Sequence, residues 1–173
     1  MASYKKLLFI VNPHAGVKKK DSALSDIILT FSDHYYETIV CFTREPGDAA
    51  KLVKEHVDDE IERVVCMGGD GTFLDVASRV GDKEIPIIGI NTGRVGFLAS
   101  FSPDHIEATM ADIYDGNFGV EAHSVLNISC DEMELRDYPF ALNEIAILKH
   151  DISSMISIHT DINDEYLTTY QAD

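Results

Sequence analysis

The 173-residue sequence has few cysteines, few basic residues and no long apolar run, and each of these absences excludes a class of protein. The three cysteines are odd in number and lack metal-ligand spacing, which predicts reduced thiols in the cytoplasm. With 30 acidic against 14 basic residues the net charge is −16, which argues against a nucleic-acid-binding or anionic-membrane-binding surface. No segment approaches the ~20 apolar residues that span a bilayer, and no signal peptide is apparent. The 45% hydrophobic content is that of an ordinary globular protein.

One stretch combines a strand, a glycine-rich turn and a helix. Residues 64–67 are apolar and predict a buried strand, residues 68–71 read Gly-Gly-Asp-Gly, and the apolar spacing over 73–80 predicts a helix that Thr72 can cap. Glycine allows another group to approach the main chain closely, and a helix start attracts phosphate oxygens. A carboxylate in that position, Asp70, can accept a proton from a hydroxyl or hold a metal ion. Taken alone, this turn is equally typical of an ordinary connection between a strand and a helix, without a ligand.

Strand and helix patterns alternate through residues 1–118. Apolar runs predict strands at 7–11, 36–42, 64–67 and 85–90, and helical spacing follows at 24–31, 49–57, 73–80 and 106–113. Strict alternation predicts an α/β fold with a parallel sheet covered by helices on both faces. Ligands of such sheets bind at the carboxyl ends of the strands, where Asn12, the 68–71 turn and Asn91 lie.

Beyond residue 119 the pattern changes to short strands separated by polar turns. Strands are predicted at 125–130, 140–148, 155–160 and 166–170. The sequence therefore predicts a nucleotide-binding α/β domain at 1–118 and the beginning of an antiparallel β domain at 119–173.

Residues 60–173 resemble the NAD kinases. The matching motifs are Gly-Gly-Asp-Gly-Thr-Phe-Leu at 68–74, Gly-Ile-Asn-Thr-Gly-Arg-Val-Gly-Phe-Leu-Ala at 89–99, Leu-Asn-Glu-Ile-Ala at 142–146 and Thr-Thr-Tyr-Gln-Ala-Asp at 168–173. Their common order and spacing make the resemblance specific. In that family a glycine- and serine/threonine-rich loop and the rest of a β domain come after this point, so the resemblance implies that the C-terminal part of the fold is missing.

The first 58 residues resemble the N-terminal part of diacylglycerol-kinase-type lipid kinases, through Phe-Ile-Val-Asn-Pro-His-Ala-Gly at 9–16 and Pro-Gly-Asp-Ala-Ala at 46–50. The two families share this nucleotide-binding fold and its Gly-Gly-Asp-Gly turn. Whether the mosaic is natural or engineered stays open. Against a lipid kinase, the turn is followed by Phe-Leu-Asp-Val at 73–76 and not by the Leu-Asn-Glu-Val typical of those enzymes.

The resemblance to NAD kinases implies phosphoryl transfer to the 2′-hydroxyl of the adenosine ribose of NAD, which gives NADP. ATP with Mg²⁺ is the usual donor, and polyphosphate serves some members. Asp70 is then the base that accepts the ribose hydroxyl proton. Gly68, Gly69 and Gly71 let substrate and donor phosphates lie against the main chain.

Further contacts are implied by the later motifs. Asn143 and Glu144 bind the adenine and ribose edges, since an amide has donor and acceptor atoms and a carboxylate accepts from a hydroxyl. Gln171 and Asp173 contact the nicotinamide-riboside half, across a subunit boundary if the chain is a homo-oligomer, as the family implies. Phe73 is a candidate adenine contact, although its helical spacing favours a core position.

Three function classes remain open at this point: an NAD kinase or a piece of one, a diacylglycerol-type lipid kinase, and a catalytically inactive nucleotide-binding fragment. The seven histidines show no metal-ligand spacing, so no metal-ligating residue is predicted. Asp75, one turn into its helix, is expected to face solvent.

Overall fold

The structure is a computed structural model that describes residues 5–16, 20–58, 60–93, 96–131, 139–149 and 155–172, with only the backbone for 20–23. Its contacts divide the chain into two compact units, Met1–Asn143 and Glu144–Asp173. The domain boundary that the sequence places at 118 stays a prediction, and the division by contacts falls later in the chain.

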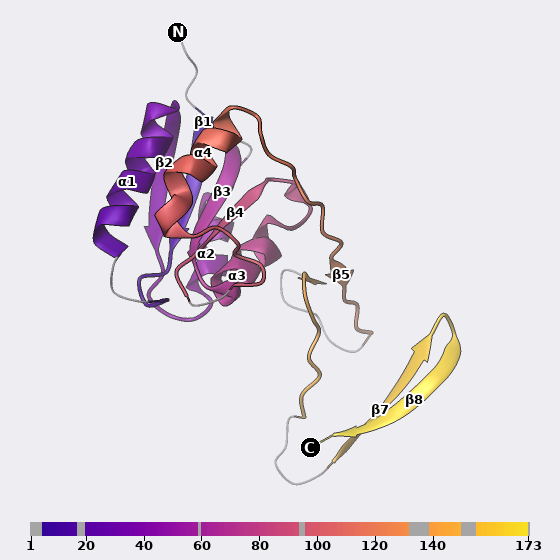
Figure 1. The fold of residues 1–173 in the computed structure, drawn as a ribbon. Helices are drawn as coiled ribbons and strands as arrows, with labels where there is room; N and C mark the ends of the chain where they lie inside the picture. The colour runs from indigo at the N-terminus through magenta and orange to yellow at the C-terminus, as the bar shows by residue number, and fades with distance from the viewer. Residues whose placement is uncertain are drawn as a thin grey trace. The chain divides into compact units, whose positions relative to one another are not determined.

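Strands and helices alternate through the first part of the chain, as the sequence predicts (Figure 1). The elements are β1 (Lys5–Val11), α1 (Lys20–Asp33), β2 (Tyr36–Phe42), α2 (Asp48–His56), β3 (Ile61–Gly68), α3 (Asp70–Val80), η1 (Gly81–Lys83) and β4 (Ile87–Asn91). The short turn η2 (Pro103–His105) then leads into α4 (Ile106–Tyr114). Ser102 caps this turn, since its side chain accepts a hydrogen bond from the backbone N–H of Asp104 at 3.3 Å.

The four strands form one parallel sheet in the order β2-β1-β3-β4. The chain steps from β1 to β2 on one side and then crosses to β3 on the other side of β1. The strand order therefore reverses between β1 and β3, so the carboxyl ends of these two strands form the switch point of the sheet. This is the place where open α/β sheets bind ligands.

The core has two layers, because alternate residues of each strand face opposite sides of the sheet. On β1, Phe9 packs with the layer under α1 and α4, whereas Ile10 packs with the layer under α2 and α3. Both side chains are 0% exposed, and burial of each contributes about 1.5–3 kcal/mol. Helices on both faces explain why the strand is a continuous apolar run without polar alternation.

The start of α3 differs from the prediction that Thr72 caps a helix beginning at 73. The helix begins at Asp70 with Gly69 as its N-cap residue, and Thr72 lies within the first turn with only 7% of its surface exposed. The hydroxyl of Thr72 accepts a hydrogen bond from the Asn12 amide instead of capping the helix. The turn is therefore shorter than expected and Asp70 is part of the helix.

Two of the four predicted C-terminal strands are much shorter than expected. The patterns at 125–130 and 140–148 give only β5 (Leu126–Asn127) and β6 (Phe140–Ala141), which pair antiparallel. Apolar residues predict a strand but not its partner, and along residues 142–149 the structure shows no ladder. The other two patterns give the antiparallel pair β7 (Ile156–Ile162) and β8 (Glu165–Ala172), joined by a tight turn whose residues Asn163 and Asp164 have φ of 53° and 66°.

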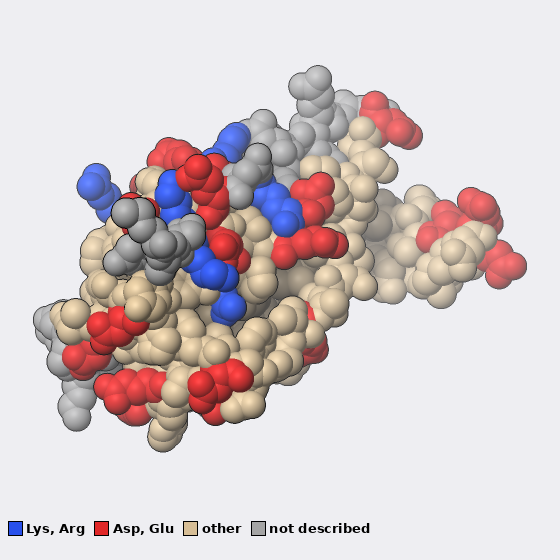
Figure 2. Space-filling view, turned by 90° about the horizontal axis from the view of Figure 1, so that it is seen from above, with Lys and Arg blue, Asp and Glu red and all other residues tan. Residues whose placement is uncertain are grey.

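Charged side chains on the face in Figure 2 are mainly acidic, with fewer basic side chains between them. Lys5 pairs with Glu62 at 2.9 Å, and Lys6 pairs with Glu60. None of the described helices is long and apolar enough to cross a membrane.

Candidate active site

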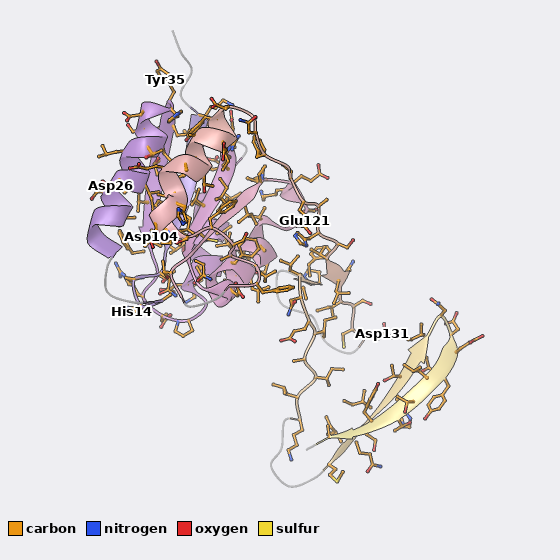
Figure 3. All side chains as sticks on the ribbon, viewed as in Figure 1. His14, Asp26, Tyr35, Asp104, Glu121 and Asp131 are labelled. Carbon is orange, nitrogen blue, oxygen red and sulfur yellow. The ribbon has the colours of Figure 1, made fainter. Side chains whose placement is uncertain are left out.

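The loop after β1 and the turn after β3 are joined at the switch point of the sheet. The backbone N–H of Asn12 donates to the Met67 carbonyl at 2.8 Å, and the Asn12 side-chain amide donates to Thr72 Oγ1 at 3.2 Å. His14, labelled in Figure 3, marks this loop at the carboxyl end of the sheet. Two segments far apart in sequence are thus fixed to each other at this end of the sheet.

The loop after β4 is joined to the same two segments through Thr92. Its backbone N–H donates to the Gly68 carbonyl at 2.9 Å, and its hydroxyl lies 3.0 Å from the Ala15 carbonyl oxygen. Gly16 passes so close that a Cβ there would lie 1.7 Å from the Thr92 carbonyl oxygen. Three loops, after β1, β3 and β4, therefore meet as one packed edge.

The carboxylate of Asp70 accepts three backbone hydrogen bonds from the continuation of the β4 loop. Phe97 N–H donates to Oδ2 at 2.8 Å, and the N–H groups of Leu98 and Ala99 donate to Oδ1 at 3.1 Å each. These donors stabilise the ionised form, with Phe97 the largest contributor, and they hold the pKa of Asp70 below its usual range. Asp70 is therefore a carboxylate at neutral pH, with its charge directed at the segment that follows Gly96.

The three glycines of the turn have different surroundings. A Cβ at Gly68 would lie 2.5 Å from Thr72 Oγ1, so this glycine allows the strand end to pack against the first turn of α3. A Cβ at Gly69 or Gly71 would meet nothing within 4 Å. The main chain beside Asp70 is therefore open on the side where these two glycines lie.

Two neighbouring side chains on α3 face inward. Phe73 packs against the core layer under α2 and α3, which favours a core position, and its role as an adenine contact stays a prediction. Asp75 is half-buried, so the expectation that it faces solvent is wrong. Burial raises the pKa of Asp75, while a hydrogen bond from the Gly47 backbone opposes that shift. The contact with the start of α2 is what turns this carboxyl inward.

The remaining candidates lie on the later part of the chain. Asn143 ends the first unit and is exposed, Glu144 begins the second unit and is exposed, and Gln171 lies on β8 opposite Ser157. Asp173 lies outside the described residues. The approach of these four residues to Asp70 stays a prediction.

Other reactive side chains do not add to the site. Cys66 is buried in the core, and burial raises the pKa of its thiol to about 12; burial also raises the pKa of Cys41. Over the described residues, no three His, Cys, Asp or Glu side chains form a group able to hold a metal ion.

Of the residues that connect the loops, the sequence predicted a place at the ligand-binding edge for Asn12 but gave Thr92 no role. Thr92 directly follows β4, and this position at a strand end was the available signal for it. The N–H groups of residues 97–99 gave no signal, because every residue except proline carries one.

A parallel α/β sheet with a glycine-flanked acid at its switch point is an arrangement typical of ligand-binding α/β domains. The family model of the ATP-NAD kinase N-terminal domain matches residues 8–118. The chain belongs to the NAD kinase family, and the match includes the N-terminal segment that resembles lipid kinases.

Named relatives agree with this assignment. The chain is 48% identical over 164 residues to the NAD kinase of Bacteroides fragilis, covering 90% of this chain and 56% of that protein. It is 41% identical over 121 residues to the NAD kinase of Porphyromonas gingivalis, covering 70% of this chain and 41% of that protein. The chain thus spans about half the length of these relatives.

Solved structures support the fold. A structure described as a diacylglycerol kinase from Bacillus anthracis matches with a TM-score of 0.50 and 22% identity, over 65% of this chain and 42% of that one. At this identity the likeness concerns the fold alone, and it agrees with the α/β arrangement predicted from the sequence.

Proposed function

We propose that the chain carries the phosphoryl-transfer edge of an NAD kinase, which moves the terminal phosphoryl group of ATP to the 2′-hydroxyl of the adenosine ribose of NAD. The observation that carries the proposal is Asp70, ionised and placed between two open glycines at the switch point of the sheet. The names of the relatives supply the substrate. Phosphoryl transfer depends mainly on positioning and charge stabilisation, which a preorganised edge of this kind provides.

In this proposal Asp70 accepts the hydrogen of the attacking ribose hydroxyl. Its low pKa makes it a weak base, but a loose transition state needs little proton removal before the phosphoryl group transfers. The principal contribution of Asp70 is therefore to orient the hydroxyl oxygen toward the phosphorus atom.

The phosphates lie against Gly69 and Gly71 at the start of α3. Open space beside these residues and the N–H groups at the start of a helix favour anionic oxygens. Mg²⁺ bound to ATP supplies charge neutralisation of the phosphates.

The rest of NAD would be held by the later motifs. Asn143 and Glu144 bind the adenosine, and Gln171 and Asp173 bind the nicotinamide-riboside half in a homo-oligomer. Phe97 adds an aromatic surface, since its side chain is 90% exposed and its backbone is bonded to Asp70. We assign this activity to the cytoplasm, in keeping with the free thiols at all three cysteines.

The test is a coupled assay for NADP with the purified chain, ATP, Mg²⁺ and either NAD or diacylglycerol, together with calorimetric titration of NAD. Formation of NADP and no lipid phosphate supports the proposal. Phosphate transfer to diacylglycerol would instead support the lipid-kinase alternative. Heat of NAD binding without NADP would show an inactive nucleotide-binding fragment and would overturn the proposed transfer for this chain.

A further inference from the structure

The two oxygens of the Asp70 carboxylate are used unequally. Among the described residues, Oδ1 accepts two N–H groups, from Leu98 and Ala99, whereas Oδ2 accepts that of Phe97 alone. Each carboxylate oxygen has two acceptor positions. One position is therefore left in this arrangement, and it lies on Oδ2 beside the N–H of Phe97.

We propose that Asp70 is the positioning residue of the 97–99 segment, and that the substrate hydroxyl takes the remaining acceptor position on Oδ2. The second half of this inference rests on the proposed function, whereas the first half concerns the chain without ligand. One oxygen then bonds both the hydroxyl and the backbone of Phe97. Binding at Asp70 and the placement of the exposed Phe97 ring are coupled through that oxygen.

Asp70 differs from an ordinary aspartate at a helix start because its hydrogen-bond donors lie far away in the sequence. Asp48, the first residue of α2, also accepts two backbone N–H groups, from Arg44 at 2.9 Å and Glu45 at 3.1 Å, but these lie in its own preceding turn. Asp70 instead holds donors that are 27 to 29 residues away in sequence, on the loop after β4. Asp48 stabilises a local turn, while Asp70 joins the start of α3 to the loop after β4.

Asp70→Asn distinguishes the two oxygens, because the new side chain has one carbonyl oxygen and one NH₂ group. Placing the oxygen at the Oδ1 position keeps two hydrogen bonds and leaves NH₂ facing the N–H of Phe97, so that bond is lost. We expect amide hydrogen exchange, measured residue by residue by NMR on the ligand-free chain, to be about tenfold faster or more at Phe97. Leu98 and Ala99 should stay within about twofold of the parent rates. Comparison within one variant removes any uniform change in stability or charge.

Two further variants serve as controls. Asp70→Ala removes every acceptor and should speed exchange at all three amides. In Asp48→Asn both amides share one oxygen, Oδ2, so the carbonyl can replace it and exchange at Arg44 and Glu45 should stay within about twofold. A uniform change across 97–99 in Asp70→Asn, or an unchanged rate at Phe97, would overturn the positioning role.

The proposed bond between the substrate hydroxyl and Oδ2 of Asp70 is tested by adding NAD to the parent chain. A change in the Phe97 amide chemical shift larger than those of Leu98 and Ala99 supports the shared oxygen, and equal changes contradict it. If Asp70→Asn shows the selective exchange but the parent chain forms no NADP, the positioning role stands and only the proposed function is overturned. NADP formation by the parent chain, together with uniform exchange in Asp70→Asn, would overturn the positioning role and support the proposed function.

Discussion

At the residue scale, Gly16 and Gly47 share one backbone angle in different surroundings. Their φ values are 81° and 82°, where an L side chain costs about 1–2 kcal/mol. A Cβ at Gly47 meets nothing within 4 Å, but one at Gly16 would overlap the Thr92 carbonyl. We expect Gly47→Ala to lower the free energy of unfolding by roughly that backbone cost and Gly16→Ala to lower it by more. Urea denaturation measures both, and equal losses would contradict the close approach of the two loops.

Asp70 and Asp75 should affect stability in opposite directions with pH. The folded pKa of Asp70 is lowered, so its contribution is present above the unfolded value of about 3.9 and is lost as pH falls through the folded pKa. The folded pKa of Asp75 is raised, so the folded state loses stability as pH rises from that unfolded value through the folded pKa.

Denaturation midpoints between about pH 3 and pH 7 check this pair. Asp70→Asn should lose less stability than the parent on acidification below about pH 4. Asp75→Asn keeps an oxygen for the Gly47 N–H and should be more stable than the parent at pH 7, with the gain disappearing near pH 3. If the denaturation midpoints of the parent and both variants changed in parallel with pH, the pKa shifts of Asp70 and Asp75 would be refuted.

Sequence reasoning identified Asp70 because a charged residue between glycines is conspicuous. It could not identify the partners of Asp70, since three backbone amides carry no residue signature. It misplaced Asp75 because helical spacing alone did not reveal the contact with the Gly47 backbone.

At the scale of elements, Thr92 joins the loops after β1, β3 and β4. Thr92→Val keeps the side-chain shape and removes the hydroxyl bond to the Ala15 carbonyl, which should cost about 1 kcal/mol of stability. Thr92→Ser keeps the hydroxyl and should lose less. Chemical denaturation measures the free energy of unfolding of both variants. Equal stability of the valine and serine variants would show that the hydroxyl bond does not stabilise the fold.

The elements also show where a sequence pattern is sufficient. Continuous apolar runs predicted β1 and β3 because burial on both faces leaves that pattern in the sequence, whereas the edge strand β2 contains Glu37 and is buried only in part. The patterns at 125–130 and 140–148 overestimated β5 and β6, since a strand also needs a neighbour with which to form a ladder.

At the scale of the whole molecule, the alternation of elements predicted a parallel sheet, and the structure added its strand order, which places the switch point between β1 and β3. The sequence did not provide that order. The strand order depends on which side of the sheet each crossover connection places the next strand, and the local pattern of residues does not indicate this side.

The second unit carries exposed apolar side chains on β8, with Leu167 53% and Tyr170 55% exposed. We expect the chain to self-associate through such surface, in line with the proposed homo-oligomer. Sedimentation velocity should show a smaller species for the double variant Leu167→Lys and Tyr170→Lys. Glu165→Lys adds the same positive charge on the same strand and should leave the association unchanged. An unaltered sedimentation coefficient in the double variant would exclude β8 from the contact.

The most direct measurement is the initial rate of NADP formation by the parent chain and by Asp70→Asn, at saturating ATP, Mg²⁺ and NAD. The account predicts measurable turnover by the parent and a loss of about a hundredfold or more in the variant, because the oriented acceptor for the ribose hydroxyl is gone. Turnover by Asp70→Asn at the parental rate would contradict the account.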